Sequence, residues 1–203
     1  MKTEHDEIRN QIVRYGLELY ERHLTDAAGG NISVRVGDVL LITPRYAGNY
    51  WHWRLRPEQI LTLDLDGNKL DGEGEISREA KVHVALLREF YPQGTAVVHA
   101  HARNILVFCA MIKPMPMVLH ATEKFGEIIQ IPDAKAHSQD LADAVLEGIR
   151  PQADRIPKGG AGVMAPKHGL FVMAKDLITG FDTVERLDTN AYCVLHAGAL
   201  GGL

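Results

Sequence analysis

Hydrophobic positions recur along the chain with two different periods, which predicts a mixture of helices and strands. Apolar residues at helical spacing, beginning with Ile8 and Ile12, predict a first helix over residues 4–23. Alternation over 32–36 and 39–43, on either side of Gly37-Asp38, predicts a hairpin. The same signals predict helices over 77–91, 102–111, 138–149 and 177–196, strands over 61–65, 96–101, 117–120 and 127–131, and a second hairpin over 162–173.

The predicted strands outnumber those that one strand-helix-strand crossover would need. We therefore expect an α/β fold, a three-layer sandwich with a mixed, largely antiparallel central sheet flanked by helices. No repeat or low-complexity linker interrupts the 203 residues, a length that is ordinary for one domain. Residues 1–203 are expected to form a single domain.

Composition and charge narrow the classes of partner. The chain is 46% apolar and 24% charged, and its net charge of −4 includes no basic run that would predict nucleic acid or an anionic membrane as a partner. The start is polar and acidic rather than a signal peptide, and no apolar run approaches the ~20 residues of a membrane span. Cys109 and Cys193 form no paired motif, which suits a reducing compartment. We expect a cytoplasmic protein whose partners are small molecules or copies of itself.

Two histidines lie on one face of the strand predicted over residues 96–101. Because side chains alternate along a strand, His99 and His101 project from the same face, about 7 Å apart. Such a pair alone is more often part of a packed core than of a metal site. His168 favours the metal site over the packed core, because it is a third histidine in a tight turn just before another apolar strand. Three imidazoles with an open position are what a catalytic zinc requires, provided that the two strands are neighbours.

Two further segments have both a structural and a functional interpretation. Gly29-Gly30-Asn31 precedes a strand, so its glycines either form a tight turn or let the backbone approach an anionic group, with Asn31 as a donor. Residues 44–57 contain both tryptophans, and this loop is either a connector or a substrate lid. Glu79 shares a helix face with His83, although the helix dipole alone favours an acidic residue in a first turn.

Five short motifs, in their order and spacing, resemble the class II aldolase/adducin-type family, and within it the fuculose-phosphate aldolases. They are Gly29-Gly30-Asn31-Ile32-Ser33, Leu41-Ile42-Thr43-Pro44, Ser77-x-Glu79, Val98-His99-x-His101 and Lys167-His168-Gly169-Leu170. The resemblance covers nearly the whole chain. It implies the α/β fold described above and a homotetramer with its sites at subunit boundaries.

The resemblance also implies roles for single residues. His99, His101 and His168 would be the ligands of Zn²⁺, with Mn²⁺ or Fe²⁺ as alternatives that imidazole also suits. Glu79 would be the acid/base beside the metal. Substrate and phosphate binding would fall to Gly30, Asn31, Ser77, Arg45 and Arg78. The adducin-like branch, which lacks the metal site, is disfavoured because all three histidines are present.

The chain departs from the fuculose-phosphate aldolase pattern at four positions. Ala28, Arg45 and Arg78 replace hydroxyl residues, so three neutral phosphate donors are missing and two arginines are available to hold phosphate or carboxylate. Ala121 stands where the tyrosine proton donor is expected, so an aldol step needs another acid. Candidates for that acid are Tyr46, Tyr50 and Glu123.

The function that the resemblance implies is reversible cleavage of a ketose 1-phosphate to dihydroxyacetone phosphate and an aldehyde. Zinc would act as a Lewis acid, and Glu79 would move a proton, typically a contribution of about 10²–10⁴-fold. One alternative uses the same site for epimerisation, dehydration or decarboxylation of a related substrate, including one that carries a carboxylate. A second alternative is a non-catalytic metal-binding protein, for which Glu79→Gln would alter only the metal affinity.

Overall fold

A seven-stranded sheet forms the middle layer of the protein. The computed structural model describes residues 3–201, so the expectations for residues 1–2 and 202–203 lie outside it. The strand order is β4-β3-β2-β1-β5-β7-β6, and all neighbouring strands run antiparallel. A parallel pairing within the described residues is limited to the single bridge Gln130–Met164. The strands are β1 (Asn31–Val36), β2 (Val39–Ile42), β3 (Leu61–Asp64), β4 (Lys69–Asp71), β5 (Ala96–Ala100), β6 (Ala161–Ala165) and β7 (Gly169–Ala174).

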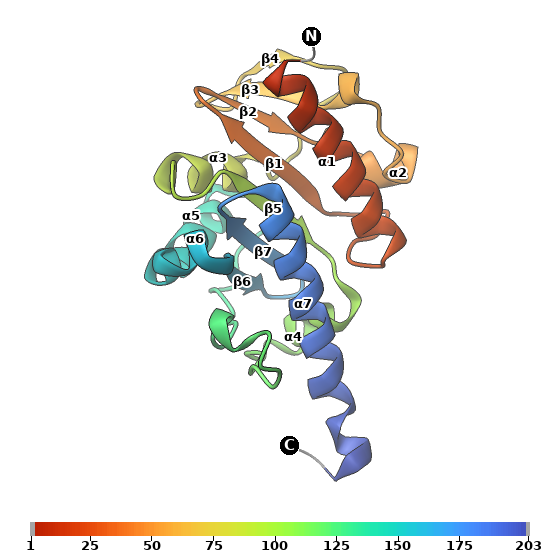
Figure 1. Cartoon of the computed structure of the whole chain (residues 1–203), viewed down its shortest axis with the longest axis vertical. Coiled ribbons are helices and arrows are strands. Elements are labelled where there is room, and N and C mark those ends of the chain that lie inside the picture. The colour runs from red at the N-terminus through yellow and green to blue at the C-terminus, as the bar shows by residue number, and fades with distance from the viewer. Residues whose placement is uncertain (1–2, 202–203) are drawn as a thin grey trace.

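Helices cover both faces of this sheet, which confirms the expected α/β class with helices flanking the sheet (Figure 1). One face packs against α1 (Glu4–Glu21), α4 (Arg103–Met111) and α7 (Leu177–His196). The other face packs against α3 (Ala80–Glu89), α5 (Gln139–Ile149) and α6 (Ile156–Gly159). Shorter helical segments are α2 (Ala47–Trp51) and the 3₁₀ turns Pro57–Gln59, Glu123–Phe125, Arg150–Arg155 and Ala197–Leu200.

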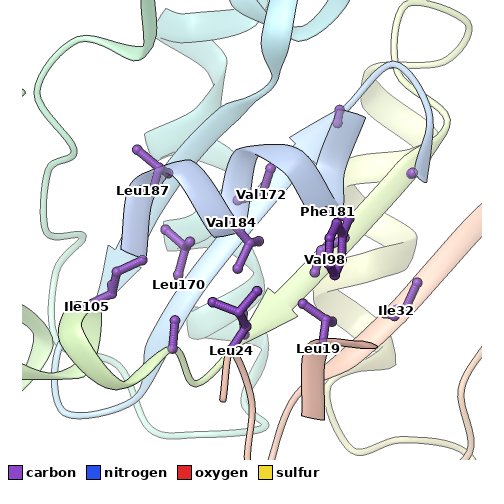
Figure 2. Close-up of a cluster of buried hydrophobic side chains, with 14 of the residues drawn as sticks. Leu19, Leu24, Ile32, Val98, Ile105, Leu170, Val172, Phe181, Val184 and Leu187 are labelled. Atoms are coloured by element: carbon purple, nitrogen blue, oxygen red, sulfur yellow. The ribbon is translucent and has the colours of Figure 1, made fainter. Parts of the chain in front are cut away.

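The alternation of side chains along β5 divides the core into two clusters. Val98 points toward α1 and α7, and Figure 2 shows it packed among Leu19, Phe181 and Val184. Val97 points the other way, toward the helices of the second face. Full burial of each such side chain stabilises the fold by about 1.5–3 kcal/mol. With a period of two, His99 follows Val97 and lies on the second face, under the start of α3.

Two predicted strands are wrong. Residues 117–118 have no regular structure and residues 119–120 form a bend and a turn, because Val118 N donates to the Asn190 side chain at 2.9 Å instead of to a strand. Residues 127–131 contribute only isolated bridges, from Ile128 and Gln130. Prediction also missed β4, whose residues are all exposed and show no apolar alternation, and α2 within the loop 44–57.

The helix predicted to begin near Ser77 begins at Ala80 instead. Glu79 is the N-cap residue rather than part of the first turn, and its side chain makes no capping hydrogen bond. Its carboxylate therefore does not accept hydrogen bonds from the free N–H groups of the first helical turn. Ser77 lies before the cap, where its hydroxyl accepts a hydrogen bond from Glu79 N at 3.3 Å.

Cys109 and Cys193 are both free thiols, as the sequence predicts. Burial raises the pKa of the Cys109 thiol to about 12. No helix within residues 3–201 combines the length and the apolar character needed to cross a membrane.

Candidate active site

Three histidines converge at one end of strand β5. His99 lies in β5, His101 follows the last residue of that strand, and His168 lies in the turn between β6 and β7. Because β5 and β7 are neighbours, with Ala100 opposite Leu170, the turn that precedes β7 reaches the end of β5. The possible ligand atoms of the three imidazoles lie within 4.8 Å of one another.

Hydrogen bonds at Nδ1 fix the rings of His99 and His101. His99 Nδ1 donates to the carbonyl oxygen of Leu170 at 3.0 Å, and His101 Nδ1 lies 3.3 Å from the Asp26 carboxylate. The two Nε2 atoms then face each other at 3.2 Å. Burial lowers the pKa of His99 well below its usual range, so its ring is neutral. Carboxylate or carbonyl partners on Nδ1 are typical of metal-binding histidines, and here they direct both Nε2 atoms toward the same point. The residues present therefore fit a divalent metal.

Glu79 lies directly against this cluster. Its side chain is 6% exposed, and its carboxylate oxygens lie 2.6 Å from His168 Nε2 and 3.3 Å from His99 Nε2. Asn31 Nδ2 donates to the same carboxylate at 3.0 Å. Burial alone would raise the pKa of Glu79, but His99, His168 and the Asn31 amide outweigh it and hold this pKa well below the usual range. The site therefore contains a buried carboxylate that stays ionised.

A chain of buried hydrogen bonds continues behind Asn31. Its Nδ2 also donates to Ser77 Oγ at 3.1 Å, while its Oδ1 accepts from His83 Nε2. Ser33 Oγ lies 2.6 Å from His83 Nδ1 and donates to it. Burial lowers the pKa of His83 to about 4 and keeps this ring neutral. Sequence reasoning placed His83 beside Glu79 but missed this network, which Ser33, two residues after Asn31 on the same strand face, could have signalled.

A cavity of about 360 Å³ opens beside the histidine cluster. Every substrate-binding residue predicted from the sequence lines it, as do Glu79, His101 and His168, whereas His99 lies fully buried behind them. Gly29 must be a glycine here, because a Cβ atom at that position would lie 2.0 Å from His101 Cε1. Gly30 has a φ of +87°. The glycine turn thus allows the close approach of backbone to the ring of His101 and borders the cavity.

The candidates for a second acid are not equally placed. Tyr46 lines the cavity, next to Arg45, whose guanidinium stacks on the Tyr46 ring at 4.4 Å and donates to Glu75 at 2.7 Å. Tyr50 is 67% exposed and does not line the cavity. Glu123 pairs with His120 at 3.0 Å on the surface. Within this chain, Tyr46 is the candidate that reaches the site.

His137 is a cavity residue that carries a titratable side chain and that sequence reasoning missed. His137 lines the cavity, with Nδ1 3.6 Å from Glu79 Oε1. It stands in an irregular segment just before α5, where neither periodicity nor a motif marks it.

Comparison with known proteins identifies the family. Residues 10–195 match the family described as the Class II Aldolase and Adducin N-terminal domain, and this chain belongs to that family. Class II aldolases are metal-dependent lyases. The resemblance inferred from the five motifs is thereby confirmed.

The relatives differ in their reactions. A 5-deoxy-D-ribulose 1-phosphate aldolase of Bacillus thuringiensis serovar kurstaki is 26% identical over 196 residues, which are 95% of this chain and 86% of that protein. A 3-oxo-tetronate 4-phosphate decarboxylase of Haemophilus influenzae is 29% identical over 187 residues, 89% of this chain and 83% of that protein. The solved structure of an L-fuculose 1-phosphate aldolase has the same fold, with a TM-score of 0.81 at 23% identity over 99% of this chain and 90% of that one.

Proposed function

We propose that this protein is a zinc-dependent aldolase that reversibly cleaves a fuculose-phosphate-like ketose 1-phosphate to dihydroxyacetone phosphate and an aldehyde. The observation that carries the proposal is the contact of the buried Glu79 carboxylate with His99 and His168, at the wall of a cavity of about 360 Å³. His99, His101 and His168 would hold the metal. Mn²⁺ or Fe²⁺ also suits this set of ligands.

The proposed chemistry divides between the metal and Glu79. A divalent cation, when bound, supplies a Lewis acid that polarises adjacent carbonyl and hydroxyl oxygens of the substrate. In the cleavage direction the C3–C4 bond breaks, the C4 hydroxyl gives up its proton, and C3 takes one up. Glu79 moves the proton at C3, and Asn31, which donates to one of its oxygens at 3.0 Å, holds the carboxylate in place. Tyr46, which lines the cavity, is our candidate for the proton at the C4 oxygen.

The phosphate would be held by residues that line the same cavity as His101 and His168. Gly30, Asn31 and Ser77 supply neutral donors there, and Arg45 and Arg78 line the same cavity. Arg45 Nε is buried and has no hydrogen-bond partner in the structure. A guanidinium binds phosphate through two parallel hydrogen bonds, which compensates for the hydroxyl donors that this chain lacks.

A second candidate function is favoured by the same two arginines. Two fixed positive charges suit a substrate that carries a carboxylate as well as a phosphate, and the Haemophilus influenzae relative is named as a decarboxylase of such a compound. Loss of CO₂, like cleavage of an aldol, leaves an electron pair on carbon. Glu79 would then move a proton at that carbon. Epimerisation and dehydration also fall within what this site would support.

The proposal includes assembly into a homotetramer with sites at subunit boundaries. Support comes from large apolar side chains that are exposed on two neighbouring helices, α4 and α7: Val107, Met111, Tyr192 and Leu195. Light scattering should give a mass about four times the 22.5 kDa of the chain. A monomer with full activity would contradict this part of the proposal.

Product analysis tests the function directly. Zinc-loaded protein should release dihydroxyacetone phosphate from at least one member of a panel of 1-phosphorylated ketoses that differ from C4 onward. Glu79→Gln, which keeps the size of the side chain, is the matched control and should bind zinc without releasing product. Release of CO₂ from a 3-oxo acid phosphate, without cleavage of any ketose, would favour the second candidate. Bound zinc with no turnover of either class would contradict an enzymatic function.

A further inference from the structure

His137 occupies an unusual backbone conformation at the wall of the cavity. Its φ is +68°, in the left-handed region that residues with a Cβ atom rarely adopt. Glycine adopts this region without strain, and asparagine, aspartate and histidine tolerate it better than other residues, so the local chain path alone does not require a histidine here. Non-glycine residues held in such conformations cluster at functional sites, where the surrounding structure compensates for the strain.

The ring of His137 has an unused hydrogen-bonding atom. Nδ1 is buried and has no hydrogen-bond partner, and Glu79 Oε1 lies 3.6 Å from it, beyond hydrogen-bond distance. The side chain as a whole is 33% exposed and lines the cavity together with Arg45 and Arg78. A buried polar atom without a partner is costly, which favours an interaction that forms only when the cavity is filled.

We propose that His137 is a substrate-binding residue, whose Nδ1 forms its missing hydrogen bond with an oxygen atom of the bound sugar phosphate. The class of ligand rests on the proposed function. Because Nδ1 lies beside the Glu79 carboxylate, the contact falls at the reacting end of the substrate. His137 thus orients the carbon at which Glu79 moves a proton.

Substitution by glycine separates this role from a structural one. Glycine adopts a positive φ without strain, so His137→Gly should unfold at the same temperature as the wild type or a higher one. It should also bind substrate less well, because the imidazole is gone. A residue kept only for the chain path would show the reverse, with no loss of affinity.

The control is a second histidine with the same backbone conformation. His23 has a φ of +60°, is exposed, and lies outside the cavity, so His23→Gly makes the same chemical change away from the site. His137→Asn is the conservative variant, since asparagine tolerates the left-handed region and keeps a shorter polar group. Its affinity should lie between those of wild type and His137→Gly.

The experiment is calorimetric titration of the zinc-loaded proteins with two probes, dihydroxyacetone phosphate and erythronate 4-phosphate, together with thermal unfolding. We expect His137→Gly to bind dihydroxyacetone phosphate about tenfold more weakly than wild type and His23→Gly to bind it equally well. The same loss seen only with erythronate 4-phosphate would support the role of His137 while contradicting the aldolase. Equal affinities of wild type and His137→Gly, or a wild type that binds neither probe, would overturn the role of His137.

Discussion

His83 Nε2 donates a hydrogen bond to Asn31 Oδ1, and this contact determines which way the Asn31 amide faces. With Oδ1 turned toward His83, Nδ2 faces the Glu79 carboxylate at 3.0 Å and Ser77 Oγ at 3.1 Å. The opposite orientation would place an amide oxygen against a carboxylate oxygen. Ser33, at 2.6 Å from His83 Nδ1, fixes the ring from the far side. His83 is therefore a positioning residue that acts on Glu79 through Asn31.

This chain of contacts predicts that substitution of His83 lowers kcat and leaves KM nearly unchanged. His83→Leu removes the donor to Asn31 and should lower kcat about tenfold while zinc content and KM stay close to wild type. His83→Gln retains an N–H donor and should recover part of the loss. Steady-state kinetics of both variants, with circular dichroism to verify folding, provide the measurement. A rise in KM with an unchanged kcat would argue against a positioning role.

The same buried ring predicts a loss of stability in acid. Burial lowers the pKa of His83 from 6.5 to about 4, so the unfolded chain takes up a proton at a higher pH than the folded one does. Stability should therefore be full above pH 6.5 and fall as the pH drops toward 4, with His83 contributing about 3 kcal/mol of that fall. Urea unfolding across this range should show a smaller fall for His83→Gln than for wild type. Equal falls would mean that His83 does not contribute.

Glu79→Gln should separate metal binding from turnover. The amide keeps the shape of the side chain but cannot carry the proton, so turnover should fall by about 10²–10⁴-fold. Zinc measured by atomic emission should remain near one ion per chain, because the three histidines are intact. Loss of the metal along with the activity would instead identify Glu79 as a ligand.

Gly29→Ala tests how closely the glycine turn packs against the proposed metal site. The new Cβ atom would lie 2.0 Å from His101 Cε1, so the ring has to move away from His99 and His168. Misplacing one imidazole should weaken zinc binding by about 10–100-fold, as competition with a chelating dye can measure. Gly198→Ala is the control, since nothing lies within 4 Å of a Cβ there. Equal zinc affinities in the two variants would contradict the packing argument.

Much of the sheet and its helices follows from local sequence, because each is marked by its own apolar period. The hairpin of β1 and β2 and the long helix α7 are examples, since turn residues or caps bound them. β4 was not predictable in this way, because an exposed edge strand has no face to bury. The strand predicted over residues 117–120 does not form, although this segment has apolar residues to bury. Its apolar residues pack without a ladder, and the buried Asn190 side chain takes the backbone hydrogen bond of Val118.

The candidate site, like the fold, was predictable from the sequence only in part. Histidines two apart on a strand, together with a family motif, identify His99, His101 and His168 before any coordinates are known. No local pattern marks His137, and local pattern places His83 beside Glu79 without giving its contact with Asn31, because both roles depend on contacts that only the folded chain creates. The contacts are those of His137 with Glu79, 58 positions earlier in the numbering, and of His83 with Asn31, 52 positions earlier.

The central claim is that Glu79 moves a proton at the carbon next to the polarised carbonyl, and hydrogen exchange tests it without knowledge of the aldehyde. Zinc-loaded protein and dihydroxyacetone phosphate would be incubated in D₂O and followed by proton NMR. We predict that one hydrogen of the hydroxymethyl carbon is replaced by deuterium, and that exchange is lost in Glu79→Gln and after removal of zinc. No exchange by wild-type protein that holds one zinc per chain would contradict the account.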